Sequence, residues 1–231
     1  ARLSEKSARG YGKFPKLTRT MLQGLDLVAA QHRNDAERFI ALGIDDRKVD
    51  VTGSIKFDIS VPEQSLAQGN ALKVQWGEAR LVMVLASSHE GEDDLILASY
   101  QQLLADFPDL LLIIVPRHPE RFDEVAAVVL DRDLHLVRRS ESFEKGNLLP
   151  SSTTQVYLAD TMGEMLLLLA SADIAIIGGS FIEHGGHNPL EACALSKAVV
   201  MGLSNYNFAA ISQQLIAEGA MQQVSAEKLT I

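Results

Sequence analysis

The sequence predicts an α/β fold, a Rossmann-like parallel sheet with helices on both faces, over residues 59–231. Three observations predict it. Short, continuously apolar runs such as "LVMVLAS" (81–87) and "LLLIIVP" (110–116) are typical of strands buried on both faces. These runs alternate with amphipathic segments of helical length. Glycines gather where an apolar run ends, above all after residue 177, and mark the corners of such a sheet.

Residues 1–58 precede this alternation. They predict short strands at 26–31 and 48–54, with a helix at 34–43 between them, capped by Asn34 and stopped by Gly43. Residues 2–19 hold six basic residues against one acid, and their glycines and Pro15 indicate a loop. This loop is either a surface for an anionic partner, such as a lipid headgroup region, or simply solvated. Residues 56–79 predict a connector with one short helix.

The alternation after residue 80 is regular. Strands are predicted at 81–87, 110–116, 134–140, 154–160, 173–179, 198–202 and 220–224. Helices are predicted between them at 90–107, after Pro119, at 163–170, from Pro189 onward and at 208–219. Because buried parallel strands need crossover helices, this order favours one doubly covered sheet.

Composition narrows the class of protein. The net charge of −9 argues against a general nucleic-acid binder, so no nucleic-acid partner is expected. No apolar run is long enough to span a bilayer. The single cysteine, Cys193, leaves no internal disulfide framework and no paired-cysteine metal site. The chain starts at an alanine and stops as a helix begins, so we expect a fragment of a longer protein.

The corner "GGSFIEHGGHNPLEACALS" (178–196) holds the strongest site signal. Asn188 is a preferred N-cap, Pro189 suits the first helical position and Glu191 falls at the third. Such a helix start presents free N–H groups and a positive dipole end, which together favour an anion. Glu191 has two interpretations: a capping acid that accepts from the Asn188 N–H, or a ligand that accepts from ribose hydroxyls.

Motifs for metal and nucleotide binding are weak or absent in this sequence. His184 and His187 lie on one loop without a fixed carboxylate spacing, which is a weak metal signal, so no metal is expected. The "DRD" at 131–133 matches the Asp-x-Asp of some glycosyltransferases but follows a helix, away from the strand-end edge, and indicates a solvated turn. No Walker A motif is present and no G-x-G-x-x-G follows the first strand of this sheet, which argues against ATPases and ordinary dehydrogenases.

Three further corners are predicted at the same edge of the sheet, where ligands bind in open α/β folds. In "PRHPER" (116–121), Arg117 follows a buried strand and suits phosphate or carboxylate, whereas Arg121 favours a surface salt bridge. In "LADTMGE" (158–164), Asp160 or Thr161 caps the next helix and leaves Gly163 and Glu164 facing the cleft. The residues of the fourth corner that could contact a ligand are Ser87, Ser88 and His89.

Four motifs, "VTGSIKFD", "PRHPER", "DTMGE" and "GGSFIEHGGHNPLEA", in this order and spacing, resemble the bacterial Kdo (3-deoxy-D-manno-octulosonic acid) transferases of lipopolysaccharide synthesis. The resemblance covers nearly the whole chain. It implies the GT-B architecture, two Rossmann-like domains facing across a cleft, of which 59–231 would be the donor-binding half. It also implies transfer of Kdo from the donor CMP-Kdo to a lipid A precursor, with inversion, and with neither a metal nor another cofactor in the nucleotide site.

The resemblance implies roles for residues of this chain. Lys56 would stabilise the transition state. Ser180, Gly186 and His187 are additional candidates near the nucleotide. The nucleotide-binding residues would be Pro116, Arg117, Gly163, Glu164, Met165, Asn188, Pro189, Leu190 and Glu191.

The same resemblance implies that most of an amino-terminal acceptor domain is missing, with its catalytic glutamate base and its membrane-anchoring region. Residues 1–58 would then be the tail of that domain and the start of the linker, and a final crossing helix would be missing too. The full-length protein would act at the cytoplasmic face of the bacterial inner membrane, and this fragment would be soluble and inactive alone. Two other functions stay open: a nucleotide-sugar epimerase of the same fold, and a non-catalytic nucleotide-binding module.

Overall fold

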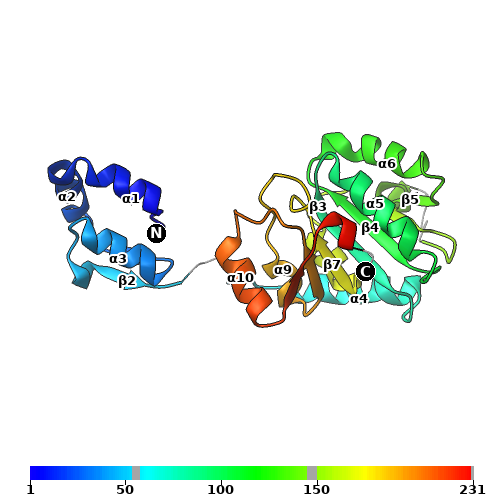
Figure 1. Ribbon diagram of the computed structural model, residues 1–231. Helices are drawn as coiled ribbons and strands as arrows, with labels where there is room; N and C mark the ends of the chain where they lie inside the picture. The colour runs from blue at the N-terminus through cyan, green and yellow to red at the C-terminus, as the bar shows by residue number, and fades with distance from the viewer. Residues whose placement is uncertain (54–57, 145–149, 230–231) are drawn as a thin grey trace. The chain divides into compact units, whose positions relative to one another are not determined.

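The computed structural model describes residues 1–53, 58–144 and 150–229 (Figure 1). The chain divides into two compact units, residues 1–58 and residues 59–231. Within the described residues, no helix combines the length and the apolar character that crossing a bilayer requires.

The first unit is a small α/β module. Its two short strands, β1 (Val28–Ala30) and β2 (Val49–Val51), pair in parallel. The helices of this unit are α1 (Glu5–Gly12), α2 (Pro15–Gln23) and α3 (Arg33–Ala41), and a short 3-10 turn, Asp46–Lys48, precedes β2. Buried Leu22, Val28 and Ile44 form its small core.

Two sequence predictions in this unit were wrong. Residues 2–19 are mostly helical, not a loop, because the Ser4 hydroxyl accepts from the Ser7 N–H and caps α1, and because Pro15 lies at the first position of α2, where its missing N–H costs nothing. Helix α3 begins one residue before Asn34, with His32 as its cap. Gly43 does end the helix, in the left-handed region at φ +104°.

The second unit contains a seven-stranded parallel sheet in the order β5-β6-β4-β3-β7-β8-β9. Its strands are β3 (Val82–Ser88), β4 (Leu111–Pro116), β5 (Leu136–Arg138), β6 (Val156–Leu158), β7 (Ile174–Ile177), β8 (Ala198–Met201) and β9 (Met221–Gln223). Its helices are α4 (Glu63–Trp76), α5 (Glu92–Leu103), α6 (Phe122–Leu130), α7 (Arg139–Glu144), α8 (Met165–Ser171), α9 (Leu190–Ala194) and α10 (Ala209–Ala217), with 3-10 turns at Pro119–Arg121 and Ala226–Lys228. The predicted Rossmann-like α/β fold is confirmed.

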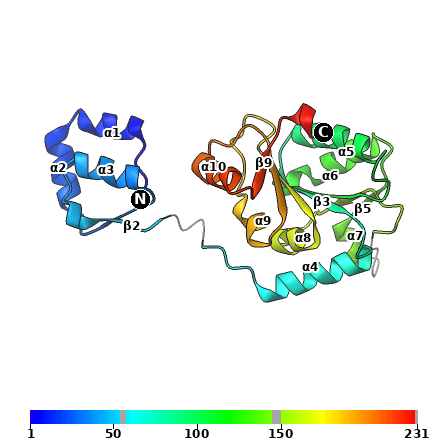
Figure 2. The same ribbon diagram turned by 60° about the horizontal axis from the view of Figure 1, so that its bottom comes forward.

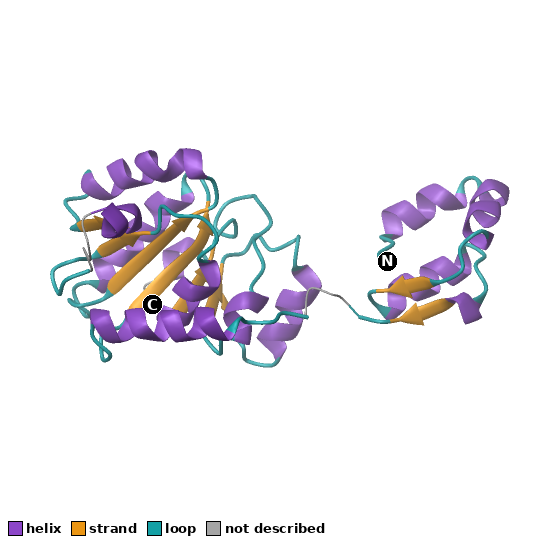
Figure 3. Cartoon of the chain, turned by 180° about the vertical axis from the view of Figure 1, so that it is seen from behind, coloured by secondary structure: helices purple, strands orange, loops and turns teal. Residues whose placement is uncertain are grey.

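Helices cover both faces of the sheet (Figures 2 and 3). Strand β3 illustrates why, because its side chains alternate between two cores. Val82 and Val84 pack into one core with residues of α4, α8 and α9. Met83 and Leu85 pack into the other with residues of α5 and α6. Both faces being apolar, the strand is continuously hydrophobic in sequence.

The predicted connector helix is longer than expected. Helix α4 spans 14 residues and packs along α8. A Cβ on Gly69 would collide with the backbone of α8 at Leu167, so the glycine permits this close approach. Leu72 and Trp76 are buried beneath the sheet.

Candidate nucleotide-binding site

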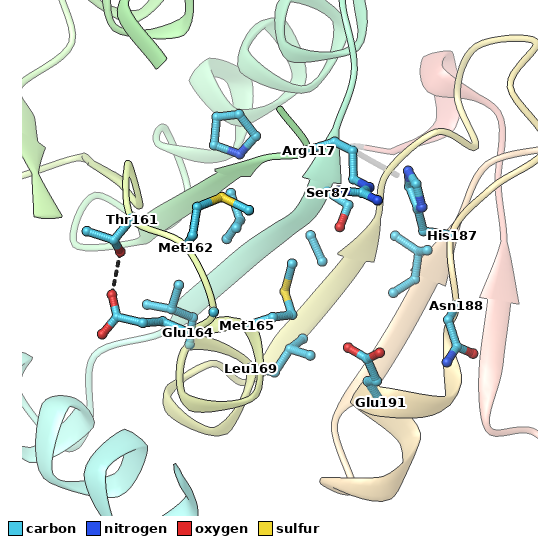
Figure 4. Close-up of a pocket in the computed structure, with 16 residues that line it drawn as sticks. Ser87, Arg117, Thr161, Met162, Glu164, Met165, Leu169, His187, Asn188 and Glu191 are labelled. Atoms are coloured by element: carbon cyan, nitrogen blue, oxygen red, sulfur yellow. Dashed lines mark hydrogen bonds between the residues drawn. The ribbon is translucent and has the colours of Figure 1, made fainter. Parts of the chain in front are cut away.

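A pocket of about 320 Å³ opens at the carboxyl ends of β3, β4 and β7, the edge at which ligands bind in open α/β sheets (Figure 4). Its floor is apolar and its rim carries polar and charged groups. The residues that line it are Ala86, Ser87, Val115, Pro116, Arg117, Thr161, Met162, Gly163, Glu164, Met165, Leu168, Leu169, Ile177, His187, Asn188 and Glu191.

All four predicted corners therefore line one pocket, and the fourth contributes Ser87. Most predicted nucleotide-binding residues line it, but Pro189 and Leu190 are buried behind its wall. Ser180 does not line it either, because its hydroxyl donates to the Ile177 carbonyl and accepts from the Gly202 N–H. Gly186 is also outside the lining, and Lys56 lies outside the described residues.

Glycine is required at Gly178 and Gly179, in the 178–186 corner, for two different reasons. A Cβ on Gly178 would collide with the Ser87 carbonyl, so only glycine lets the loop cross the end of β3. Gly179 has φ +67°, which glycine adopts without strain. Ser87 itself has φ +62°, where the pairing of β3 with β4 shifts register. Positive φ at a residue other than glycine is concentrated at ligand-binding corners.

Glu92 fixes this corner, and the sequence did not single it out. Its fully buried carboxylate accepts from the backbone N–H groups of Gly179 at 2.7 Å and of Ser180 and Phe181 at 3.0 Å. It also accepts from the His89 N–H at 3.3 Å. Burial raises the pKa of Glu92, and these hydrogen bonds oppose the rise. The only sequence signal was an acid in the first turn of a helix, which is common.

The helix start at Asn188 agrees with the prediction in its capping hydrogen bond but not in its first helical residue. Helix α9 begins at Leu190 with Pro189 in the cap position. The Asn188 Oδ1 accepts from the Leu190 N–H at 3.2 Å, two residues on, which is the hydrogen bond expected of an N-cap asparagine. Because α9 has five residues, its dipole is much weaker than that of a long helix, and the predicted anion site cannot rest on it.

Glu191 is not a capping acid. It makes no hydrogen bond or ion pair with any residue that the structure describes, the Asn188 N–H included. Its carboxylate is half-buried and directed into the pocket (Figure 4). Burial without a compensating partner raises the pKa of Glu191. Of its two interpretations, this geometry favours the one in which Glu191 accepts hydrogen bonds from a ligand.

Glu164, by contrast, is already paired. Its carboxylate accepts from Arg139 at 2.7 and 3.1 Å and from the Thr161 hydroxyl. These hydrogen bonds hold the pKa of Glu164 below its ordinary value, against the opposing effect of burial. The predicted caps of α8 were wrong: Asp160 accepts from Arg138 and Ser140 instead, and Glu164 is the cap residue.

The two arginines of the "PRHPER" corner have opposite surroundings. Arg121 is buried and pairs with Asp93 at 2.6 Å and Glu124 at 2.8 Å, so the predicted salt bridge exists but is not on the surface. Arg117 is exposed at the pocket rim. Its guanidinium has no ion pair or hydrogen bond within the described ranges. It is therefore available to an anion.

Histidines gather beside Arg117. The donor atoms of His89, His184 and His187 lie within 4.8 Å of one another, so by position these side chains could hold a metal ion. His89 Nε2 and His187 Nε2 are 2.7 Å apart and hydrogen bond each other. Burial, and secondarily the neighbouring basic groups, lowers the pKa of both to about 4. The sequence placed His184 and His187 on one loop and His89 at another predicted corner, but it did not show that the three side chains meet.

Comparison with solved structures defines the class of protein. UDP-GlcNAc 2-epimerase from Neisseria meningitidis matches with a TM-score of 0.53 and 16% identity, over 98% of this chain and 56% of that one. A glycosyltransferase from Rickettsia africae matches with a TM-score of 0.51 and 17% identity, over 100% of this chain and 56% of that one. At such identities the likeness is one of fold. The chain has the fold of GT-B glycosyltransferases and related epimerases.

Closer relatives define the family. The C-terminal CMP-Kdo binding domain of WaaA from Acinetobacter baumannii matches with a TM-score of 0.68 and 37% identity, over 73% of this chain and 86% of that one. The 3-deoxy-D-manno-octulosonic acid transferase of Haemophilus influenzae is 40% identical over 98% of this chain and 52% of its own length. Residues 1–59 match the family described as 3-Deoxy-D-manno-octulosonic-acid transferase (kdotransferase). The chain belongs to the Kdo transferase family, and it spans about half the length of the curated relatives it matches.

Proposed function

We propose that this chain is the donor-binding part of a Kdo transferase, which binds CMP-Kdo in the pocket at the end of β3, β4 and β7. The observation that carries the proposal is that two charged side chains of the lining have no partner among the described residues: Arg117 at the rim and Glu191 in the wall. An arginine suits the phosphate of CMP and an acid suits its ribose hydroxyls. The Acinetobacter relative is described as a CMP-Kdo binding domain, which supports CMP-Kdo as the donor.

The chemistry of the transfer assigns further roles. The C2–O bond of CMP-Kdo breaks, its electron pair stays on the phosphate oxygen, and a carbocation-like centre forms at the sugar. Fixed positive charge at the rim stabilises the leaving phosphate without a metal ion. Lys56, which lies outside the described residues, is proposed to add to this stabilisation. The acceptor hydroxyl needs a general base. We assign that base to the part of the relatives' length that this chain does not span.

The whole protein is proposed to transfer Kdo to a lipid A precursor at the cytoplasmic face of the inner membrane. Residues 1–58 are then the end of the acceptor-binding domain, and residues 59–231 are the donor-binding domain. The support for this division is the family match to residues 1–59 and the separate packing of the two units.

The test is a calorimetric titration of this chain with CMP, UMP and UDP, in EDTA and in magnesium. We expect CMP to bind best and equally in both buffers. Kdo transfer to a lipid A precursor should stay at background with this chain and appear with the full-length protein. Preference for UDP would favour the epimerase class, loss of CMP binding in EDTA would point to a metal site, and turnover by this chain alone would contradict the assignment of the base.

A further inference from the structure

A cluster of four histidines borders the pocket. His89 follows β3, His118 follows β4, and His184 and His187 belong to the loop after β7. The ring centroid of His89 lies 3.9 Å from that of His184, 5.0 Å from that of His187 and 5.7 Å from that of His118. His187 also lines the pocket beside Arg117, so the cluster reaches the space that a ligand would occupy (Figure 4).

We propose that this histidine cluster, together with Arg117, binds the phosphate of the nucleotide, and that the cluster takes up a proton as the phosphate binds. The proposal rests on the proposed function and adds to it the groups that recognise the phosphate and the protonation that accompanies binding. It assigns a role to His89 and His184, which the pocket lining itself does not include.

The charged groups that face His89 and His187 help to explain why the pKa of each is low. Arg117 and Arg121 approach it from the end of β4 and the turn after it. The acid that contacts the His89 backbone is Glu92, whose oxygens accept from four backbone N–H groups. Burial together with this positive surrounding disfavours an imidazolium at neutral pH.

The remaining facing groups do not change this balance. Arg121 is itself neutralised by Asp93 and Glu124. His118 pairs with Glu120 only at 4.0 Å and at the surface. His184 is exposed and contributes to the low pKa values of His89 and His187. Among the described residues, no carboxylate therefore pairs with the imidazole of His89, His184 or His187.

A bound phosphate supplies an anion. Its negative charge raises the pKa of nearby imidazoles, because opposite charge favours the protonated form. The 2.7 Å contact between His89 and His187 requires one nitrogen to donate and the other to accept. A further proton on the accepting nitrogen would break this contact and free an N–H to donate to a phosphate oxygen. As the C2–O bond of the donor breaks, the phosphate gains a second negative charge, and the imidazolium stabilises it further.

An anion fits the cluster better than a metal ion. The Nε2 atoms of His89 and His187 point at each other across a hydrogen bond, with the rings 4° from parallel, so they do not converge on a common third point. Arg117 places a full positive charge beside His187, which opposes a divalent cation.

The experiment is calorimetry of CMP binding at pH 7.5, with EDTA, in two buffers that differ in ionisation enthalpy. At this pH the CMP phosphate is already a dianion, so a net proton uptake belongs to the protein. We expect uptake in the wild type and its loss in His89→Gln and in His187→Gln. His135→Gln, an exposed histidine before β5 at the opposite edge of the sheet, is the matched control and should keep the uptake.

The pH dependence gives a second readout. As pH rises from 6.5 to 8.5, the complex of the wild type loses its extra proton and CMP binding weakens. The His187→Gln variant should bind about tenfold more weakly than wild type at pH 6.5 and nearly equally at pH 8.5. Equal binding at pH 8.5 also shows that the variant is folded.

Inorganic phosphate as a second probe separates this proposal from the proposed function. CMP binding without proton uptake, or uptake that survives both substitutions, would overturn the histidine proposal and leave the donor site intact. Phosphate binding with uptake, when CMP binds no better than phosphate, would support the histidine site and contradict a nucleotide site. Binding that disappears in EDTA would overturn the proposal in favour of a metal centre.

Discussion

Glu164 and Glu191 occupy equivalent places and have opposite surroundings. Each lies at the start of a helix that follows a strand of the parallel sheet, and each lines the same pocket. Glu164 accepts from Arg139 and Thr161 and has a lowered pKa. Glu191 has no partner in the described part of the chain and a raised pKa. The Glu164 carboxylate is engaged in contacts within the pocket wall. The Glu191 carboxylate remains free to accept hydrogen bonds from a ligand.

The arginines of the neighbouring corner repeat this division. Arg121 is buried between two acids, whereas Arg117 is exposed and lines the pocket. Removing one partner of a buried ion pair is strongly destabilising, because the other charge is left buried and unpaired. A charged side chain without a partner costs little only where it reaches water or a ligand. Pairing thus separates structural from ligand-binding charges more clearly than residue type or position in a motif does.

The largest effect is expected from Arg121→Ala. The substitution leaves Asp93, whose side chain is 3% exposed, buried without its cation. The free energy of unfolding should fall by about 3–5 kcal/mol in urea denaturation. Arg132→Ala removes a partner of the half-exposed Asp94 and is the matched control, with an expected loss of at most about 1 kcal/mol. Equal losses in the two variants would contradict the distinction between buried and exposed pairs.

Arg117→Ala should change binding and not stability. The guanidinium contributes a charge-assisted contact to the phosphate, so CMP binding should weaken by about 1.5–3 kcal/mol in calorimetry. Because Arg117 has no partner among the described residues, the free energy of unfolding should stay within about 0.5 kcal/mol of wild type. An unchanged dissociation constant would remove Arg117 from the site.

The strands could be predicted from the sequence because they are buried on both faces. Residues 82–86 and 111–116 are continuous apolar runs, and the burial of these strands agrees with their local sequence preference. The helices of residues 5–23 could not, because Gly10, Gly12 and Pro15 read as loop residues wherever they occur. In the structure the two glycines lie in the last turn of one helix and Pro15 at the first residue of the next, and these positions are compatible with helix. The residue types alone do not distinguish such positions from a loop.

The site shows a similar limit. Corners at strand ends could be predicted, since parallel strands bring their carboxyl ends to one edge, and Arg117 and Glu191 do line one pocket there. The sequence could not predict whether a side chain of the site already forms a hydrogen bond or ion pair with another residue of the chain. Glu92, which holds the loop at 179–181 through its backbone, and His89, which meets His187 from another strand, depend on contacts across about 90 residues of sequence, which local patterns do not report.

Glu164→Gln tests the paired half of the comparison. The amide cannot form the ion pair with Arg139, so the free energy of unfolding should fall by about 1–2 kcal/mol at pH 7. Because the folded-state pKa of Glu164 is lowered, its contribution is present above its ordinary pKa of 4.5 and is lost as pH falls through the folded-state value. The difference between variant and wild type should therefore shrink on acidification. Exposed Glu90→Gln is the control, and a difference that is constant with pH would contradict the ion pair.

Glu191→Gln tests the unpaired half and should have the smallest effect, with the opposite sign for stability. A carboxylate whose folded-state pKa is raised costs stability once it ionises, so the cost is absent below its ordinary pKa of 4.5 and appears as pH rises through the folded-state value. The amide has no charge to bury, so the variant should be more stable than wild type by about 0.5 kcal/mol at pH 7 and equal to it at pH 4.

The same variant should bind CMP about fivefold more weakly, a loss of ~1 kcal/mol, because an amide oxygen is a poorer acceptor for ribose hydroxyls than a carboxylate. Inorganic phosphate, which has no ribose, should bind variant and wild type equally. A gain in stability with a loss confined to CMP is what an acid kept for a ligand predicts. A loss of stability with unchanged CMP affinity would return Glu191 to the role of a capping residue, and the contrast with Glu164 would then not mark which charges belong to the ligand.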